Sequence, residues 1–239
     1  LPGRLRLRRR VRLRTLKPVK ILVANLGSTS LKWRLFDFAN NAERLLHKGG
    51  FERVTDYPQA IEDCLSELKK SGAIAAENEL AAVGFKTVIA QGVDGCVRLT
   101  EEVLHAMEAY NGLAPAHNPP YIAGIRLFAK RMPRTPLIGL FETAFYQWAP
   151  EPAKRYAVPD DWYRLGVRRW GFHGASHKFI AERSAQLLRR EDVARRADTG
   201  KPATGRGIVG DEQEVIGALA QCARHAVDDA HAADGLESF

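Results

Sequence analysis

Residues 20–38 have the sequence KILVANLGSTSLKWRLFDF, and this stretch decides the fold of the first part of the chain. A short apolar run, residues 20–24, is followed by a polar segment with glycine and serine at residues 25–30. Apolar residues then alternate at Leu31, Trp33 and Leu35, and they continue less strictly to Phe38. Alternation favours a strand with one buried face, so the stretch predicts a β-hairpin with its polar tip at residues 25–30.

Outward from this hairpin, helical and strand patterns alternate along the chain. Apolar runs predict strands over residues 80–90 and 135–141, with a short extended piece at 156–158. Helical spacing predicts helices over residues 58–71, 100–110, 122–131 and 174–190. Alternating helices and strands place most of the chain in the α/β class.

The composition is that of a globular protein. Of the 239 residues, 45% are hydrophobic and 27% charged, which excludes a wholly disordered or collagen-like chain. Apolar runs stay well short of the roughly 20 residues that cross a bilayer, so no membrane partner is expected. The distant cysteines Cys64, Cys96 and Cys222 lack metal-ligand spacing. They are interpreted as buried or incidental thiols of a reducing compartment, and a cytoplasmic location is expected.

The net charge of +8 is confined to the start of the chain. Residues 1–17 hold seven arginines, one lysine and no acidic residue, so residues 18–239 are neutral. Three interpretations stay open: a nucleic-acid or membrane-surface arm, an organellar transit segment, and non-native sequence. The last is favoured because the chain opens with Leu1 and its first methionine is Met107. Residues 1–17 are expected to be a disordered extension, and no nucleic-acid partner is expected.

The character of the sequence changes near Arg190. Residues 198–210 are rich in glycine and proline, which is typical of a linker. We therefore expect one domain over residues 18–190 and a linker over residues 191–211. The alanine-rich segment 212–239 is expected to contain one terminal helix, and it carries no recognisable chemistry.

The tip of the predicted hairpin is the first candidate for chemistry. Gly27 permits a tight turn, and the hydroxyls of Ser28 and Ser30 with nearby backbone N–H groups can cradle a phosphate. Lys32 adds a positive charge, and Asn25 begins the motif. The alternative is a polar turn that glycine and serine favour in any case.

Three further motifs carry candidate residues. LAPAHNP at residues 113–119 stiffens a loop around His117, although a turn role for Asn118 is an equal alternative. FETAF at residues 141–145 places Glu142 at the end of a strand, where ligands gather in α/β sheets, unless it is a surface or capping carboxylate. RRWGFHGASH at residues 168–177 places His173 at a helix N-terminus, which outlines an anion site, although a lone histidine is more often structural.

In order and content together, these motifs resemble the acetate kinase (acetokinase) family of the actin-like ATPase and sugar-kinase superfamily. The likeness covers about residues 20–190. It implies a ribonuclease H-like α/β fold, the N-terminal domain of an acetate kinase with the C-terminal domain missing. It also implies reversible transfer of the γ-phosphoryl group of ATP to acetate or another short carboxylate with Mg²⁺, and a homodimer for full-length members.

The resemblance assigns roles one position at a time. Asn25 falls at a magnesium-associated position, and Lys86 and His117 fall at substrate-binding positions. His173 matches a histidine that stabilises the transferring phosphoryl group, which suits a transition state with charge spread over its oxygens. Glu142 stands at a position usually assigned proton transfer, and a metal-water or positioning role is favoured because acetate is already ionised. The implied phosphate-binding residues are Ser28, Ser30 and Lys32.

The chain departs from the family pattern in two ways. Lys86 stands where the family has an arginine, Phe85 replaces a histidine, and Glu142 replaces an aspartate. The second glycine-rich phosphate motif, the adenosine-binding motif, a catalytic arginine and a magnesium-binding glutamate have no counterpart after Arg190. We therefore expect a truncated or frameshifted phosphotransferase with little turnover of its own. The alternatives are a non-catalytic binding module and, with no supporting motif, nucleic-acid binding through the arginine-rich start.

Overall fold

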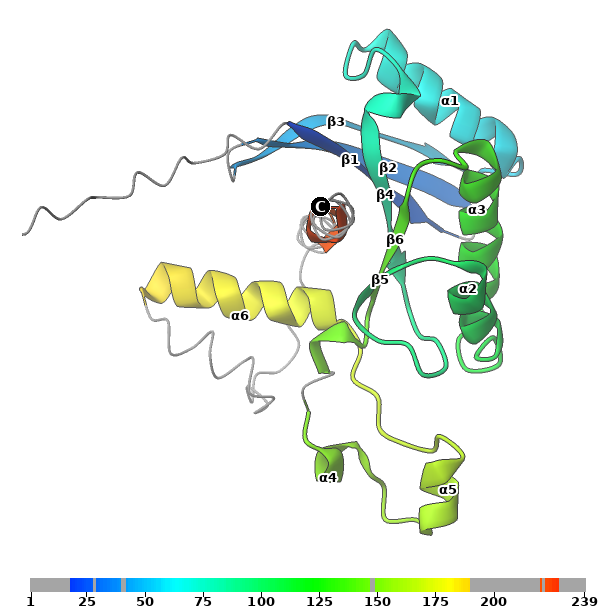
Figure 1. The fold of residues 1–239 in the computed structure, drawn as a ribbon, viewed down its shortest axis with the longest axis vertical. Helices are drawn as coiled ribbons and strands as arrows, with labels where there is room; N and C mark the ends of the chain where they lie inside the picture. The colour runs from blue at the N-terminus through cyan, green and yellow to red at the C-terminus, as the bar shows by residue number, and fades with distance from the viewer. Residues whose placement is uncertain are drawn as a thin grey trace, which may run out of the picture.

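The computed structural model describes residues 18–27, 29–39, 42–146, 149–189, 220 and 222–227. Its centre is a six-stranded sheet in the order β3-β2-β1-β4-β6-β5 (Figure 1). β1 pairs in parallel with β4, and β4 with β6, while the remaining neighbours are antiparallel. The strands are β1 (Val19–Leu26), β2 (Ser30–Ala39), β3 (Ala42–Glu52), β4 (Leu80–Thr87), β5 (Cys96–Arg98) and β6 (Leu137–Phe141).

The predicted hairpin is confirmed as β1 and β2. Asn25 lies opposite Lys32, and the Gly27 N–H donates to the Ser30 carbonyl over 2.8 Å to close the turn. The third strand of this meander, β3, was not predicted, because its charged and glycine residues interrupt any alternation. One of those glycines is required by packing: a Cβ at Gly49 would lie 2.3 Å from a ring carbon of Trp33.

Helices cover both faces of the sheet. α1 (Tyr57–Lys70), α2 (Glu101–Glu108) and α3 (Asn118–Arg131) pack on one face, and α6 (Gly174–Leu188) lies on the other side in Figure 1. The short helices α4 (Glu151–Lys154) and α5 (Asp160–Arg164) belong to an excursion before α6. Two 3₁₀ turns, η1 (Glu77–Glu79) and η2 (Ala144–Tyr146), complete the elements.

Several predicted boundaries were wrong. α3 begins at Asn118 instead of residue 122. The backbone N–H groups of a first helical turn have no partner within the helix, so the prolines that follow Asn118 are tolerated there. β4 ends at Thr87 and does not continue to residue 90. Residues 156–158 are not a strand; they lie between α4 and α5, neither of which was predicted.

Strand alternation divides the core into two layers. Even-numbered residues of β1, such as Leu22 and Ala24, face α1–α3. Odd-numbered residues such as Ile21 and Val23 face the opposite side, where Ala223 and Val227 of the terminal segment pack on them. Residues 222–227 are helical, and apart from these and residue 220 the segment 212–239 lies outside the described residues. Residues 1–17 and the predicted linker 191–211 lie outside the described residues, so the domain boundaries stay predictions.

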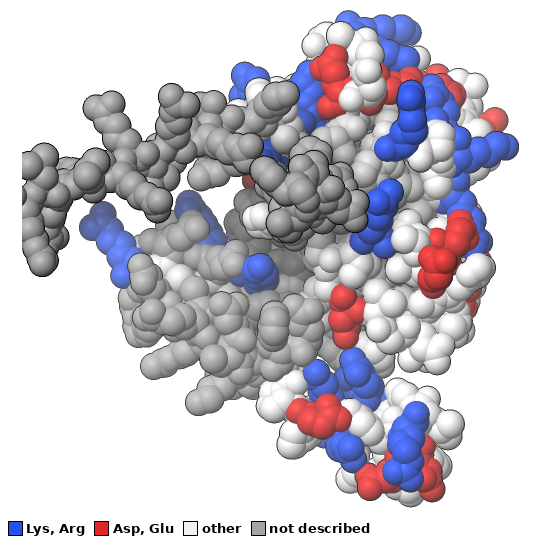
Figure 2. All heavy atoms as spheres, in the orientation of Figure 1, with Lys and Arg blue, Asp and Glu red and all other residues white. Residues whose placement is uncertain are grey.

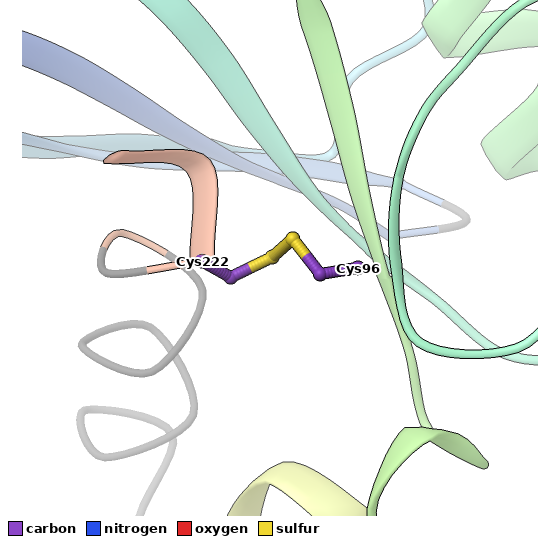
Figure 3. The surroundings of a disulfide bond; sticks show 2 residues. All are labelled: Cys96 and Cys222. Atoms are coloured by element: carbon purple, nitrogen blue, oxygen red, sulfur yellow. A yellow bond between two sulfur atoms is a disulfide. The ribbon is translucent and has the colours of Figure 1, made fainter. Parts of the chain in front are cut away.

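The interpretation of the cysteines was wrong for two of the three. Cys96 on β5 and Cys222 in the terminal segment form a disulfide that spans 126 positions of sequence (Figure 3). The two cysteines are close because the terminal segment packs on the sheet. Their spacing in the sequence does not reveal this proximity. Cys64 is a buried free thiol, as expected, and burial raises its pKa.

The face of the molecule that Figure 2 shows carries both signs of charge. Figure 2 shows lysine and arginine side chains interspersed with aspartate and glutamate, in keeping with a neutral chain after residue 17. Among the described residues, no helix combines the length and apolar character that would be needed to cross a membrane.

Candidate active site

The carboxyl ends of the parallel strands bring three predicted site residues to one edge of the sheet. Ala24 of β1 pairs with Phe85 of β4, so the next residues, Asn25 and Lys86, follow on the same face. β6 pairs with β4 at Thr87 and Phe141, which places Glu142 directly after this edge. The position agrees with the general tendency of α/β sheets to bind ligands beyond the carboxyl ends of their strands.

Glu142 is the centre of the arrangement. It is only 8% exposed, and the Lys86 ammonium lies 2.5 Å from its Oε1 atom. The His173 Nδ1 atom lies 3.6 Å from Oε2. A carboxylate this buried needs such partners, because an unpaired buried charge is costly. Three residues predicted from separate motifs therefore meet in one cluster.

His173 is held at the start of α6 by an unusual backbone conformation. Its φ angle is +58°, in the left-handed region that residues other than glycine seldom adopt. The His177 N–H donates to the His173 carbonyl over 3.0 Å, and the following Gly174 N–H donates to the Glu142 carbonyl over 2.8 Å. The ring is 64% exposed. This geometry turns an exposed imidazole toward Glu142 beside a helix N-terminus, where anions are favoured.

The predicted phosphate turn lies on the neighbouring hairpin. Lys32 is opposite Asn25 in the register, and its ammonium lies 3.4 Å from the Glu52 carboxylate on β3. The Tyr57 hydroxyl, which was not predicted, donates to the Gly27 carbonyl over 2.5 Å and so fixes the turn from α1. Burial raises the pKa of Tyr57. Ser30 is the first residue of β2, and Ser28 lies outside the described residues.

The LAPAHNP motif at residues 113–119 has a clear structural role. Asn118 is fully buried, and its side-chain amide donates to the carbonyls of Ile89 and Met107 over 3.0 and 2.9 Å. His117 is exposed at the start of α3, with its ring 5.9 Å from that of Tyr121. None of the contacts among the described residues joins His117 to Lys86, Glu142 or His173.

A network beside the cluster was missed by the sequence analysis. The Thr143 hydroxyl donates to Asp94, whose second oxygen lies 3.3 Å from Arg168. The Arg168 guanidinium also stacks 4.0 Å from the Trp170 ring. These contacts tie the residue after Glu142 to the segment that leads into His173. Thr143 and Arg168 stand in the FETAF and RRWGFHGASH motifs, but Asp94, in a glycine-containing loop, by itself indicates nothing more than a turn.

Comparisons with known proteins identify the family. A model described as the acetokinase family matches residues 47–196. The chain belongs to the acetokinase family. Over 197 residues it is 38% identical to the acetate kinase of Carboxydothermus hydrogenoformans, and over 195 residues it is 36% identical to that of Bacillus subtilis. These matches cover 71% and 72% of the chain and 49% of each relative, so the chain spans about half the length of the curated relatives it matches.

Solved structures of the acetokinase family agree. The crystal structure of Porphyromonas gingivalis acetate kinase matches with a TM-score of 0.62 at 33% identity, covering 72% of this chain and 49% of the other. A propionate kinase from Francisella tularensis matches with a TM-score of 0.59 at 28% identity, covering 72% of this chain and 50% of the other. The partial coverage fits the N-terminal domain fold that the resemblance implied.

The three departures from the family pattern have different structural consequences. Phe85 is 1% exposed and packs edge-on against Phe128, with ring centroids 5.2 Å apart, so it belongs to the core beneath α3. Lys86, one position later, faces the opposite side and pairs with Glu142. Only the lysine and the glutamate therefore alter the candidate site.

The donor set is compatible with a nucleotide-bound magnesium ion. The described residues contain no group of three or more His, Cys, Asp or Glu side chains placed to hold a metal. Magnesium bound with ATP needs fewer protein ligands, because phosphates and water fill most of its coordination sphere. The Asn25 amide oxygen is an oxygen donor of the kind it prefers. It would hold the ion, which would neutralise charge on the phosphates.

Proposed function

We propose that this chain provides the acyl-substrate half of a phosphotransferase that converts ATP and acetate, or another short carboxylate, into ADP and an acyl phosphate. The observation that carries the proposal is the cluster of Lys86, Glu142 and His173 at the carboxyl edge of the sheet. Relatives named acetate kinase and propionate kinase support a carboxylate as the acceptor. The proposal includes magnesium as the ion that accompanies ATP.

The proposal assigns a role to each predicted site residue. Lys86 would bind the substrate carboxylate as a point charge, with His117 as a second substrate contact across the loop. His173 would donate to the oxygens of the transferring phosphoryl group, whose charge rises toward the transition state. Asn25 would orient the metal, and Glu142 would position Lys86 and His173. Ser28, Ser30 and Lys32 would hold nucleotide phosphate.

The 239-residue chain alone should produce little or no acyl phosphate. Phosphoryl transfer needs the nucleotide held in line with the acid and cations on both sides of the γ-phosphate. Arginine contacts of that kind are worth about 10³–10⁵ in rate, and the chain offers no counterpart of them after Arg190. Hydroxamate trapping with purified chain, MgATP and acetate measures this directly. Activity that disappears in His173→Ala would refute the expected inactivity and confirm the chemistry.

Binding tests the site independently of turnover. Acetyl phosphate added to the chain should shift the backbone amide resonances of residues 173 and 174 in a saturable way, and the shifts should be lost in Lys86→Met. A non-catalytic binding module is the second candidate. Saturable binding of both acetate and MgATP with no hydroxamate would support that candidate. Absence of any saturable shift would refute the proposed site.

A further inference from the structure

The Glu142 carboxylate already occupies the groups that the proposed function assigns to the substrate. One oxygen lies 2.5 Å from the Lys86 ammonium and the other 3.6 Å from the His173 ring. The pair of Lys86 and Glu142 carries no net charge. A carboxylate or phosphate that approaches Lys86 therefore meets a second anion held against the same ammonium.

The main chain of Glu142 is held by hydrogen bonds that do not involve its carboxylate. Its backbone N–H donates to the Thr87 carbonyl over 2.9 Å, and its carbonyl accepts from the Gly174 N–H over 2.8 Å. These bonds fix the main chain between β4 and α6. A change of the Glu142 side-chain rotamer would leave these main-chain bonds intact.

A lysine at this position increases the competition between Glu142 and the substrate anion. An arginine presents five donors in a planar fork and can bind one carboxylate on each edge. The lysine ammonium is a compact point charge on a flexible stem, so two anions must share one small group. Like charges brought together at an interface cost several kcal/mol.

We infer that Glu142 is an internal competitor for the substrate anion and that its carboxylate must leave Lys86 before the anion binds. This inference rests on the proposed function. It makes Glu142 a residue that sets the anion affinity of the site, in addition to its positioning role. The predicted consequence is that removal of the carboxylate strengthens anion binding.

The chain provides a matched control. Lys20 and Glu79 form a second lysine–glutamate pair, with 2.6 Å between the ammonium and the carboxylate. Lys20 lies opposite Leu80, at the amino end of β4, so this pair is at the other edge of the sheet from Lys86. Neutralising Glu79 changes the net charge as much as neutralising Glu142 does, without touching the candidate site.

The test is a titration of the full chain with inorganic phosphate, in which the NMR resonances of the backbone amides are monitored. Acetate is used as a second probe. Glu142→Gln should bind phosphate at least about tenfold more tightly than the wild type. Glu142→Ala should show the same gain, and it serves if the glutamine variant does not fold. Glu79→Gln should bind like the wild type. In the double variant Lys86→Met with Glu142→Gln, the gain should disappear.

The outcomes distinguish failure of the competitor inference from failure of the anion site. Equal or weaker phosphate binding in both Glu142 variants, with the wild type still binding, would overturn the competitor inference and leave the anion site standing. Absence of saturable binding in every variant would overturn both. A gain of equal size in Glu79→Gln would show a general charge effect and would also overturn the inference.

Discussion

Reduction of the bond between Cys96 and Cys222 should lower the thermal stability of this chain markedly. The bond closes a segment of 126 positions and joins the edge strand to residues that pack on the sheet. A loop of this length corresponds to about 5 kcal/mol of unfolded-state entropy at 25 °C, as an upper value. For a chain of this size each kcal/mol shifts the melting temperature by about 2–4 °C. A fall of roughly 10–20 °C is the largest expected.

The assay is a melting curve followed by circular dichroism, with and without a phosphine reductant, paired with a thiol count in denaturant. The oxidised chain should show one reactive thiol, from Cys64, and the reduced chain three. Cys222→Ser should melt near the reduced wild type and should not respond to reductant. Three reactive thiols before reduction would refute the pairing itself. A count that rises from one to three with no change in melting temperature would refute the stabilising role.

Three other perturbations test the packing and electrostatics of the domain. Asn118→Ala should lower the free energy of unfolding by about 2–4 kcal/mol, measured by urea denaturation, because two buried carbonyls lose their donor; a loss below 0.5 kcal/mol would contradict this. The Arg131 guanidinium lowers the pKa of Glu77, so the stability from this pair is present at neutral pH and lost as pH falls through that lowered pKa. Glu77→Gln should therefore show a weaker fall in stability between pH 5 and 3, and an unchanged profile would refute the assignment. Lys86→Met should destabilise the fold by about 1–3 kcal/mol, because it leaves the mostly buried Glu142 without its ammonium; the loss should shrink when Glu142→Gln is added.

The parts of the fold that could be predicted are those with strong local patterns. The hairpin of β1 and β2 and the helix α1 each present one apolar face, and a buried face requires regular spacing. β3 could not be predicted, because it lies at the edge of the sheet and carries many charged residues. The disulfide and the packing of residues 222–227 depend on contacts across more than a hundred positions, to which no local pattern corresponds.

In the candidate site, too, the residues with a local sequence signal could be predicted and the long-range contacts could not. Glu142 and His173 could be placed because strand ends and helix starts are where ligands gather, and both motifs are marked by glycine or polar residues. The bridge from Thr143 through Asp94 to Arg168 could not be predicted, since it joins three segments that carry no shared signal. Asn118 stood in a motif considered for chemistry, yet its amide nitrogen donates to two backbone carbonyls of the core.

The two departures from the resembled family pattern that face the site change the lengths of both partners of one ion pair. A lysine in place of an arginine shortens the base and removes its fork, while a glutamate in place of an aspartate lengthens the acid by one methylene group. In this chain the longer acid reaches the shorter base, and the ion pair closes at 2.5 Å. Phe85, the third departure, faces the core and leaves the pair untouched. The 2.5 Å contact therefore depends on both side chains: Lys86→Arg alone should crowd Glu142, and Glu142→Asp alone should open the ion pair.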